Sequence, residues 1–292
     1  MKWISFFLAT SALFLNAAFG VYKPRVIYGD DNRQDLYEVQ NPALAEVSLS
    51  TAAMIGVKSL TPANGLFQIK TVKYGEEYQL CAEERFFHQP AAAMCSGFLV
   101  GENLLATAGH CLSQMDCREW AFVFNFAMRG GQESPTTVRE DDVYFCQEVI
   151  SREYTSRQDY ALVRLDRAVK GPRPLRLASE PAKALDPVVV VGHPSGLPTK
   201  ATDGAQVRST VQEYFVTNLD TYGGNSGSAV FNEATLEVLG ILVRGERDYR
   251  YDYENRCYRS VQCGMDSCRG EDVTHISYIR QSLAESNVTY LD

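Results

Sequence analysis

Short apolar runs alternate with clusters of turn-forming residues along most of the chain from residue 51 onward. Apolar runs of about four to eight residues, bounded by Gly, Pro, Asn or Asp, are typical of β-strands. In the first half they predict strands over 68–72, 95–100, 104–106, 121–126, 143–150 and 160–165. Segments such as Gly101-Glu102-Asn103 supply the turns between them. This half is therefore expected to be built of strands.

The second half repeats the pattern after a proline-rich connection at 171–174, which is the best candidate for a domain boundary. Here the apolar runs predict strands over 187–191, 206–211, 214–219, 228–231 and 238–243. Only the end of the chain differs, because 273–284 places Ile276, Ile279 and Leu283 on one helical face. One terminal helix is therefore expected.

Many short strands with a single terminal helix predict an all-β protein of two packed antiparallel β-barrels. We expect the first barrel over 51–170 and the second barrel, with the helix, over 171–292. Residues 21–50 precede the barrels as a polar arm, in which 43–50 is expected to form one or two helical turns.

The first 20 residues have the features of a signal peptide. A basic residue, Lys2, is followed by an apolar run over 4–15 and then by the small-residue end Ala18-Phe19-Gly20. A membrane-spanning helix needs about 20 apolar residues in a row, and no later stretch has that length. The sequence therefore predicts a secreted protein, extracellular or periplasmic.

Charge argues against two classes of partner. The net charge is −8, and it becomes −9 when the single charge of Lys2 is lost with the signal peptide. Proteins that bind nucleic acid or anionic membranes concentrate Lys and Arg in patches, and this chain has no such cluster. We therefore expect neither nucleic acid nor a membrane as partner.

Eight cysteines in an exported chain indicate disulfides formed in an oxidising compartment. A zinc site at Cys257, Cys263 and Cys268 is the alternative. Their spacing lacks the two-residue gap of zinc-binding motifs, and the only nearby histidine is His275. We expect no metal and no cofactor.

Three segments carry the residues that a serine peptidase requires: a hydroxyl, an imidazole to activate it and a carboxylate to orient the imidazole. His110 follows a predicted strand hairpin, Asp159 stands at the start of an apolar strand, and Ser226 lies in the glycine-rich turn Gly223-Gly224-Asn225-Ser226-Gly227-Ser228. Taken alone, this turn is equally consistent with an ordinary Gly/Ser loop. The other histidines, His88, His193 and His275, are expected in loops or at the surface.

Four motifs together resemble those of the trypsin-like, or chymotrypsin-fold, serine peptidases. They are Ser-Gly-Phe-Leu-Val at 96–100, Ala-Thr-Ala-Gly-His-Cys at 106–111, Asp-Tyr-Ala-Leu at 159–162 and Gly-Asn-Ser-Gly at 224–227. The resemblance covers about residues 51 to 283. It implies His110 as general base, Asp159 as its orienting partner, Ser226 as nucleophile, and the N–H groups of Gly224 and Ser226 as the oxyanion hole.

The resemblance also implies protein or peptide substrates, and we expect a monomer. It further implies a disulfide between Cys95 and Cys111, across the histidine loop. A bond between Cys117 and Cys146 is a plausible second pair, and the pairing of Cys81, Cys257, Cys263 and Cys268 stays open. The alternative function is a catalytically silent member of the family that serves as a binding module.

Within the family, the chain looks most like the bacterial glutamyl endopeptidases. Those enzymes also have Asn before the nucleophile, as at Asn225, and their mature chains begin like the segment 26–33, Val-Ile-Tyr-Gly-Asp-Asp-Asn-Arg. The resemblance implies processing after Arg25, so that 21–25 would be a short propeptide. In animal digestive members, an Asp at the place of Asn225 pairs with the new terminal amine. A neutral amide cannot form this ion pair, so activation by that switch is not expected.

Family spacing places Asp220 at the base of the primary specificity pocket, beside Thr221, which favours cleavage after Lys or Arg. The histidine by which glutamyl endopeptidases recognise glutamate is replaced by Leu242. Arg244, near the pocket rim, opposes a cationic substrate, so acidic or apolar specificity is the alternative. The segment Val243-Arg244-Gly245 should be the edge strand to which the substrate backbone adds.

Overall fold

The computed structural model describes residues 27–112, 116–131 and 133–286. The expected signal peptide at 1–20 and the expected propeptide at 21–25 lie outside these residues. Among the helices that are described, none has the length and apolar character needed to cross a membrane.

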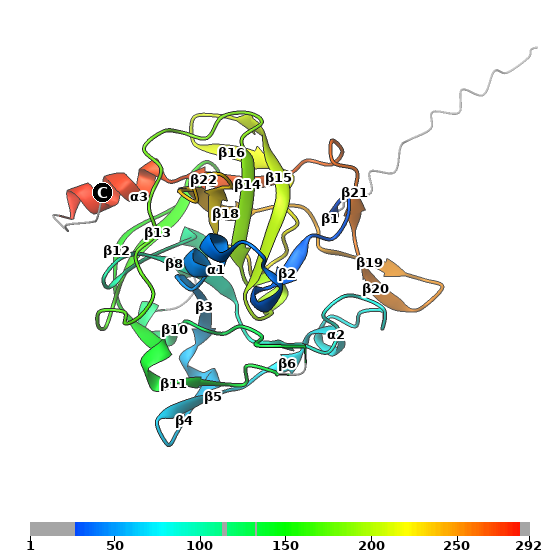
Figure 1. Cartoon of the computed structure of the whole chain (residues 1–292), viewed down its shortest axis with the longest axis horizontal. Helices are drawn as coiled ribbons and strands as arrows, with labels where there is room; N and C mark the ends of the chain where they lie inside the picture. Colours follow the sequence, from blue (N-terminus) through cyan, green and yellow to red (C-terminus); the bar gives the residue numbers. More distant parts are fainter. Residues whose placement is uncertain (1–26, 113–115, 132, 287–292) are drawn as a thin grey trace, which may run out of the picture.

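Six antiparallel strands close into a first barrel, which occupies the lower left of Figure 1. Their order around the barrel is β10, β12, β13, β9, β8 and β3. The strands are β3 (Thr51–Gly56), β8 (Cys95–Gly101), β9 (Leu104–Thr107), β10 (Trp120–Val123), β12 (Val143–Tyr154) and β13 (Asp159–Leu165). All six lie within the range expected for this barrel.

A second ring of six antiparallel strands runs in the order β14, β17, β18, β22, β16 and β15, and the pairing of β14 with β15 closes it. The strands are β14 (Pro187–Gly192), β15 (Lys200–Thr210), β16 (Tyr214–Thr217), β17 (Ala229–Asn232), β18 (Val238–Arg244) and β22 (Glu271–His275). Helix α3 (Ser277–Glu285) follows the last strand. The predicted all-β architecture of two barrels with a C-terminal helix is confirmed. The boundary between 170 and 171 stays a prediction.

The end of the second barrel corrects one expected element. The helix predicted over 273–284 begins only at Ser277, and the residues before it form the strand β22. All five residues of β22 are buried between β16 and β18, but only Val273 is apolar, so the strand lacks the apolar run by which the other strands were predicted. Strand β3 was not predicted either, although Ala-Ala-Met-Ile at 52–55 is a short apolar run.

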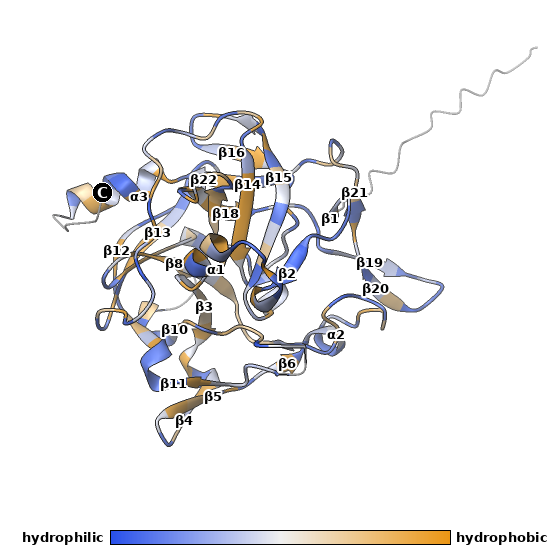
Figure 2. Ribbon diagram, viewed as in Figure 1, coloured by the Kyte–Doolittle hydropathy of each residue, from blue (hydrophilic) through white to orange (hydrophobic). Residues whose placement is uncertain are grey.

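One hydrophobic cluster extends across both barrels. A single cluster of buried side chains includes Phe98 and Leu162 from the first barrel and Val190 and Ile241 from the second. Figure 2 shows the hydrophobic character of the strand β14 at the centre of the molecule. Because burial of apolar surface is the main favourable term in folding, this common core fixes how the barrels sit against each other.

Smaller elements decorate the barrels. Helix α1 begins after Asn41, whose side chain accepts hydrogen bonds from the N–H groups of Ala43 and Leu44. These elements are β1 (Ile27–Tyr28), β2 (Arg33–Asp35), α1 (Pro42–Ser48), β4 (Leu60–Ala63), β5 (Leu66–Ile69), β6 (Val72–Lys73), α2 (Tyr74–Glu77), β7 (Pro90–Ala91), β11 (Thr137–Arg139), β19 (Tyr249–Asp252), β20 (Cys257–Ser260) and β21 (Gln262–Cys263).

Four disulfides link these parts. The structure joins Cys95 to Cys111 and Cys117 to Cys146, the two pairs that the sequence favoured. The pairs that the sequence left open are Cys81 with Cys257 and Cys263 with Cys268. The bond from Cys81 ties the segment before β8 to the hairpin of β19 and β20.

A buried ion pair anchors strand β2 to strand β15 of the second barrel. Lys200 Nζ contacts Asp35 Oδ1 and donates a hydrogen bond of 2.7 Å to Gln89 Oε1. Both charged side chains are almost completely buried. Burial lowers the pKa of Lys200 to about 8, against the opposing effect of the Asp35 carboxylate.

Replacing Asp35 by Ala should reduce the free energy of unfolding by about 3–5 kcal/mol at pH 6, because it leaves a buried ammonium without its partner. Without Asp35 the pKa of Lys200 falls further. The electrostatic part of the loss is therefore full at low pH and disappears as pH rises through about 8, where Lys200 is neutral. Urea unfolding at pH 6 and pH 9 measures both effects.

The matched control is Glu237→Ala, which removes the partner of the exposed Arg176 and should change stability by less than about 1 kcal/mol. Equal losses in the two variants would show that the buried pair is not an anchor.

Candidate active site

Strands β9 and β13 bring His110 and Asp159 together. These strands are antiparallel neighbours, with Ala161 opposite Thr107, so the start of β13 lies beside the turn that follows β9. Asp159 Oδ1 accepts a hydrogen bond of 3.0 Å from the backbone N–H of His110. Asp159 Oδ2 lies 2.8 Å from Nδ1 of the His110 ring. An ionised carboxylate can only accept a hydrogen bond, so Nδ1 carries the proton and Nε2 is the basic nitrogen of the neutral ring.

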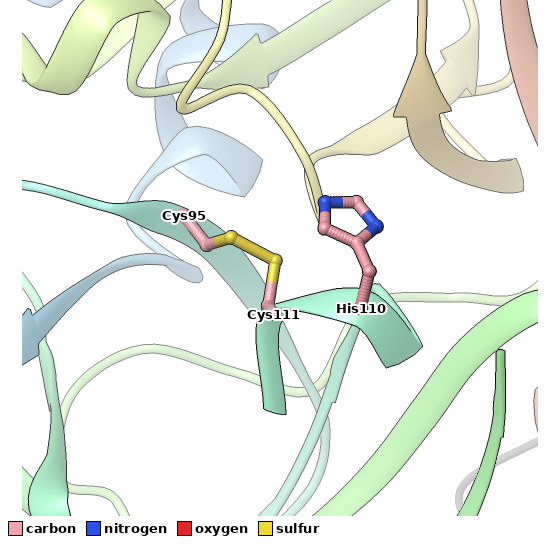
Figure 3. Close-up of side chains that lie close together, drawn as sticks. All are labelled: Cys95, His110 and Cys111. Atoms are coloured by element: carbon pink, nitrogen blue, oxygen red, sulfur yellow. A yellow bond between two sulfur atoms is a disulfide. The ribbon is translucent and has the colours of Figure 1, made fainter. Parts of the chain in front are cut away.

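Close packing fixes the turn that carries the histidine. A Cβ at Gly109 would collide with the carbonyl oxygen of Glu153, so only glycine fits there. Arg152 Nε donates a hydrogen bond of 2.7 Å to the carbonyl oxygen of Gly109. Figure 3 shows the disulfide of Cys95 and Cys111 beside the histidine, and a nitrogen of the His110 ring lies within 4.8 Å of both sulfur atoms. The imidazole is thus held from both sides of the turn.

The sulfur atoms of Cys95 and Cys111 and the His110 ring are the one group of three potential metal ligands found among the described residues. Metal ligation by cysteine requires a thiolate. Both sulfur atoms are bound in the disulfide, so this group cannot hold a metal ion.

The loop that carries Ser226 is docked onto strand β8 of the first barrel. The N–H of Ser96 donates to the carbonyl oxygen of Ser226 at 2.8 Å, and Ser96 Oγ donates to that of Gly224 at 2.9 Å. The same Oγ accepts from the N–H of His193 at 3.0 Å. Ser96 precedes Phe98 on the strand that begins at Cys95, so the serine loop is fixed beside the disulfide of the histidine turn.

Two glycines give the loop its shape. Gly224 and Gly227 have φ angles of +91° and +89°, which other residues rarely adopt. Within the described part of the chain, the hydroxyl of Ser226 and the N–H groups of Gly224 and Ser226 make no hydrogen bond. Such contacts in catalytic sites often form only when substrate is bound.

A pocket of about 290 Å³ opens beside Ser226. The predicted substrate-binding residues Thr221, Arg244 and Gly245 line it, whereas the predicted Val243 is buried in β18 and does not. The remaining lining residues are Tyr222, Gly223, Leu242, Glu246, Arg247, Asp248 and Glu271. Three carboxylates therefore face one small pocket.

The structure corrects the expected position of Asp220. Its carboxylate does not line the pocket but accepts hydrogen bonds from the backbone N–H groups of Tyr28, at 2.7 Å, and Asn32, at 3.0 Å. Both donors belong to the N-terminal arm, which runs behind the pocket wall. The spacing between Asp220 and Ser226 did not predict the position of the carboxylate, because spacing cannot show which groups donate hydrogen bonds to it.

The buried acid that does line the pocket is Glu271, at the start of β22. Its Oε2 accepts a hydrogen bond of 2.5 Å from Thr221 Oγ1, and it contacts Gly245 so closely that a Cβ there would collide with it. Burial raises the pKa of Glu271 to about 8, and the negative charges of Asp248 and Glu246 contribute. Among the described residues Glu271 has no cationic partner within ion-pair distance. No helix or strand was predicted at residue 271, so nothing in the sequence indicated that this carboxylate is buried beside the pocket.

Two further pocket residues are held by neighbours. Asp248 Oδ2 accepts a hydrogen bond of 2.8 Å from the N–H of Gly223, and burial raises the pKa of Asp248 to about 6. Arg244 Nε donates to Asp272 Oδ2 at 2.9 Å, so its charge is balanced by a carboxylate outside the pocket. Arg244 therefore opposes a cationic substrate less than its sequence position indicated.

The remaining histidines are not alike. His88 is exposed, and His193 lies in the loop after Gly192 but is buried, whereas His275 is buried in strand β22, which corrects the expectation of a loop or surface position for His275. His193 Nδ1 lies 3.0 Å from the carbonyl oxygen of Leu197, and burial lowers the pKa of His193 to about 4. His193 is thus a neutral structural residue next to the serine loop.

Two barrels that carry a His–Asp pair on one side of their seam and a glycine-flanked serine on the other define the class of trypsin-like serine peptidases. The model of the trypsin-like peptidase domain matches residues 95–241, about half of the chain. The chain belongs to this family. No curated protein sequence gives a significant match.

Three solved structures with the same fold are distant in sequence. The Rv3671c protease of M. tuberculosis, in an inactive form, is 17% identical over 86% of this chain and 95% of its own, with a TM-score of 0.50. The VesB protease of Vibrio cholerae is 16% identical over 88% and 67%, with a TM-score of 0.52. A Glu endopeptidase is 15% identical over 89% and 99%, with a TM-score of 0.51. At these identities the likeness shows the fold alone.

Replacing Ser96 by Ala should lower the free energy of unfolding by about 1–3 kcal/mol, because the buried N–H of His193 and carbonyl of Gly224 lose their partner. Urea unfolding with the disulfides intact measures the loss. Ser209→Ala is the control, since Ser209 is exposed on β15 and its removal should change stability by less than about 0.5 kcal/mol. A Ser96→Ala protein as stable as this control would show that the serine loop does not depend on Ser96.

Proposed function

We propose that this chain is a secreted serine endopeptidase that hydrolyses peptide bonds through Ser226, His110 and Asp159 by way of an acyl-enzyme. The observation that carries the proposal is the pair of hydrogen bonds from His110 to Asp159, at the seam where the loop of Ser226 docks. The predicted signal peptide and the four disulfides support export to an oxidising compartment.

Each residue has one role in the reaction. Nε2 of His110 accepts the proton of Ser226 Oγ as that oxygen attacks the carbonyl carbon of the scissile bond. The histidine then gives this proton to the departing amine, which leaves an acyl-enzyme ester on Ser226. Water attacks the ester in the second half, again with His110 as base, and restores the serine. Asp159 stays ionised and keeps the ring in the tautomer with Nδ1 protonated.

The negative oxygen that forms in both halves of the reaction needs N–H donors. We assign this role to the N–H groups of Gly224 and Ser226. Two observations support it: neither group is used by another described residue, and the positive φ of Gly224 turns the loop sharply just before the nucleophile. An L-residue with a side chain would be strained at this position.

The segment from Val243 to Gly245 is proposed to bind the substrate backbone. Pairing of β17 with β18 ends at Ile241, so one edge of the following residues has no strand neighbour in the described structure. An extended peptide can add there as a further strand, which fixes its backbone without reading its sequence. Arg244 is positioned at this edge by Asp272.

For specificity, we propose that Glu271 and Asp248 select Lys or Arg before the scissile bond. A buried carboxylate without a cationic partner is costly, and an incoming ammonium or guanidinium group relieves that cost. The same carboxylates repel glutamate, and Leu242 offers no hydrogen bond to it. Glu271 thus takes the role that the sequence gave to Asp220.

Ser226→Ala should lower peptide hydrolysis on the order of a millionfold, and Asp159→Asn by roughly four orders of magnitude near neutral pH, with the fold intact. Turnover of a peptide library by purified protein, together with circular dichroism, measures both. Ser209→Ala, which removes an exposed hydroxyl, should keep full activity. Full activity of folded Ser226→Ala would overturn the proposed function.

The preference for Arg over norleucine before the scissile bond should rise as pH increases through about 8. Glu271 is protonated below its raised pKa and attracts a cation only above it. The ratio of kcat/KM for two matched peptides reports this, because titration of the histidine cancels in the ratio. We expect a rise of at least about tenfold, corresponding to one charge-assisted hydrogen bond.

Glu271→Gln should make the ratio independent of pH in this range. Asp266→Asn has the same change in charge at an exposed site and should leave the rise unchanged. A constant ratio in the wild type, or a preference for Glu, would contradict the role of Glu271.

A further inference from the structure

We propose that the N-terminal arm, residues 27–35, is an intramolecular clamp that holds the segment 220–224 in its catalytic conformation, with Asp220 as the positioning residue. The inference rests on the proposed function, because residues 221–223 of this segment line the pocket and the segment leads directly into the nucleophile loop. Asp220 touches neither substrate nor the reacting atoms and acts through the segment that it begins.

The first contact of the clamp is with the Asp220 carboxylate. Its two oxygens accept one hydrogen bond each from the arm, from the N–H of Tyr28 and from the N–H of Asn32. Asp220 is 3% exposed and has no ion-pair partner among the described residues. Because a buried carboxylate without donors is strongly disfavoured, the segment can keep this conformation only while the arm is in place.

The second contact of the clamp is with the side chain of Tyr222. The guanidinium group of Arg33 lies 4.2 Å from the centre of the Tyr222 ring, a cation–π contact, and Asp31 holds it there through two hydrogen bonds. Ile27 packs against Tyr222 as well. Arg33 is 1% exposed, so this contact is shielded from water and is stronger than a surface pair.

Both ends of the arm pair with other strands, so the arm is held in one position against the segment 220–224. Strand β1 pairs with β21, with Ile27 N–H donating to Val261 O and Gly29 N–H to Cys263 O, both at 2.8 Å. Strand β2 pairs with β15 and carries the buried ion pair of Asp35. Figure 1 shows both short strands beside the second barrel.

Fixing the segment 220–224 sets two parts of the site at once. Thr221 donates to Glu271, and Gly223 N–H donates to Asp248, so both pocket carboxylates are oriented by it. The next residues are Gly224 and Asn225, which precede the nucleophile. Loss of the clamp should therefore reduce turnover of the folded enzyme, in addition to any loss of stability.

Both arm donors are internal backbone N–H groups, and neither is a terminal amine. Asn225 is neutral, and its Oδ1 lies 3.4 Å from the Ser228 hydroxyl. Because both donors lie inside the chain, the clamp does not need a new N-terminal amine. It follows that removal of residues 21–25 is not required for activity.

Three variants of the full chain test the clamp. Asp220→Asn keeps the shape of the side chain but presents an NH₂ group to one arm donor, and Asn32→Pro deletes one donor N–H. Asn32→Ala keeps that N–H and is the matched control. We expect kcat per titrated active site to fall at least about tenfold in the first two variants, and to stay within about twofold of wild type in the control.

Two measurements, kcat per active site and the unfolding temperature, distinguish a positioning role of Asp220 from a purely structural one. A purely structural role would lower the unfolding temperature but leave kcat per active site unchanged at 25 °C, which would overturn the proposal. If Asp220→Asn does not fold, the comparison of Asn32→Pro with Asn32→Ala decides in the same way. Peptidase activity in the wild type that persists in both variants refutes the clamp alone, whereas an inactive wild type refutes the proposed function and the clamp with it.

Arg25→Gln tests the second consequence. With the processing point blocked, and the terminus checked by N-terminal sequencing, kcat should stay within about twofold of wild type. A protein that keeps residues 21–25 and is inactive until they are removed would overturn a clamp made by internal N–H groups.

Discussion

The docking of the serine loop onto strand β8 is the contact on which the rest of the site depends. Neither barrel contains a complete site, since one carries His110 and Asp159 and the other carries Ser226. Ser96 joins them with its N–H and its hydroxyl, which hold the carbonyl oxygens on both sides of Asn225. The hydrophobic cluster that spans both barrels holds them together, and these few hydrogen bonds then fix the serine loop on the strand that begins at the disulfide of the histidine turn.

Buried carboxylates show which parts of the site are structural and which face a substrate. Asp159 is satisfied by His110, Asp220 by two arm N–H groups, and Asp272 by two arginines, so each of them holds the protein's own chain. Glu271 is equally buried but has only a hydroxyl and one long backbone hydrogen bond, of 3.4 Å from Glu246 N–H. Because burying a charge without a counter-charge is costly, the protein tolerates it where an incoming cation can supply the missing partner.

Local motifs predicted the fold class and brought His110, Asp159 and Ser226 to attention, because each sits on a short turn or strand end with its own sequence signal. The acid that faces the pocket could not be predicted in this way. Asp220 and Glu271 differ in role because N–H groups of the arm bind the carboxylate of Asp220 and not that of Glu271. The arm lies about 190 residues before Asp220 in the chain. Strand β22 was missed as well, because four of its five residues are polar and only their position between β16 and β18 shows that they are buried.

The most direct test of the account is labelling of the purified protein by a fluorophosphonate probe, with the modified residue mapped by mass spectrometry. Such a probe reacts with a serine only where a base and an oxyanion site activate it, so it reports the assembled site and not the fold. The account predicts one stoichiometric adduct on Ser226, formed far more slowly in Asp159→Asn. A folded protein that forms no adduct, or forms it on another serine, would contradict the central claim.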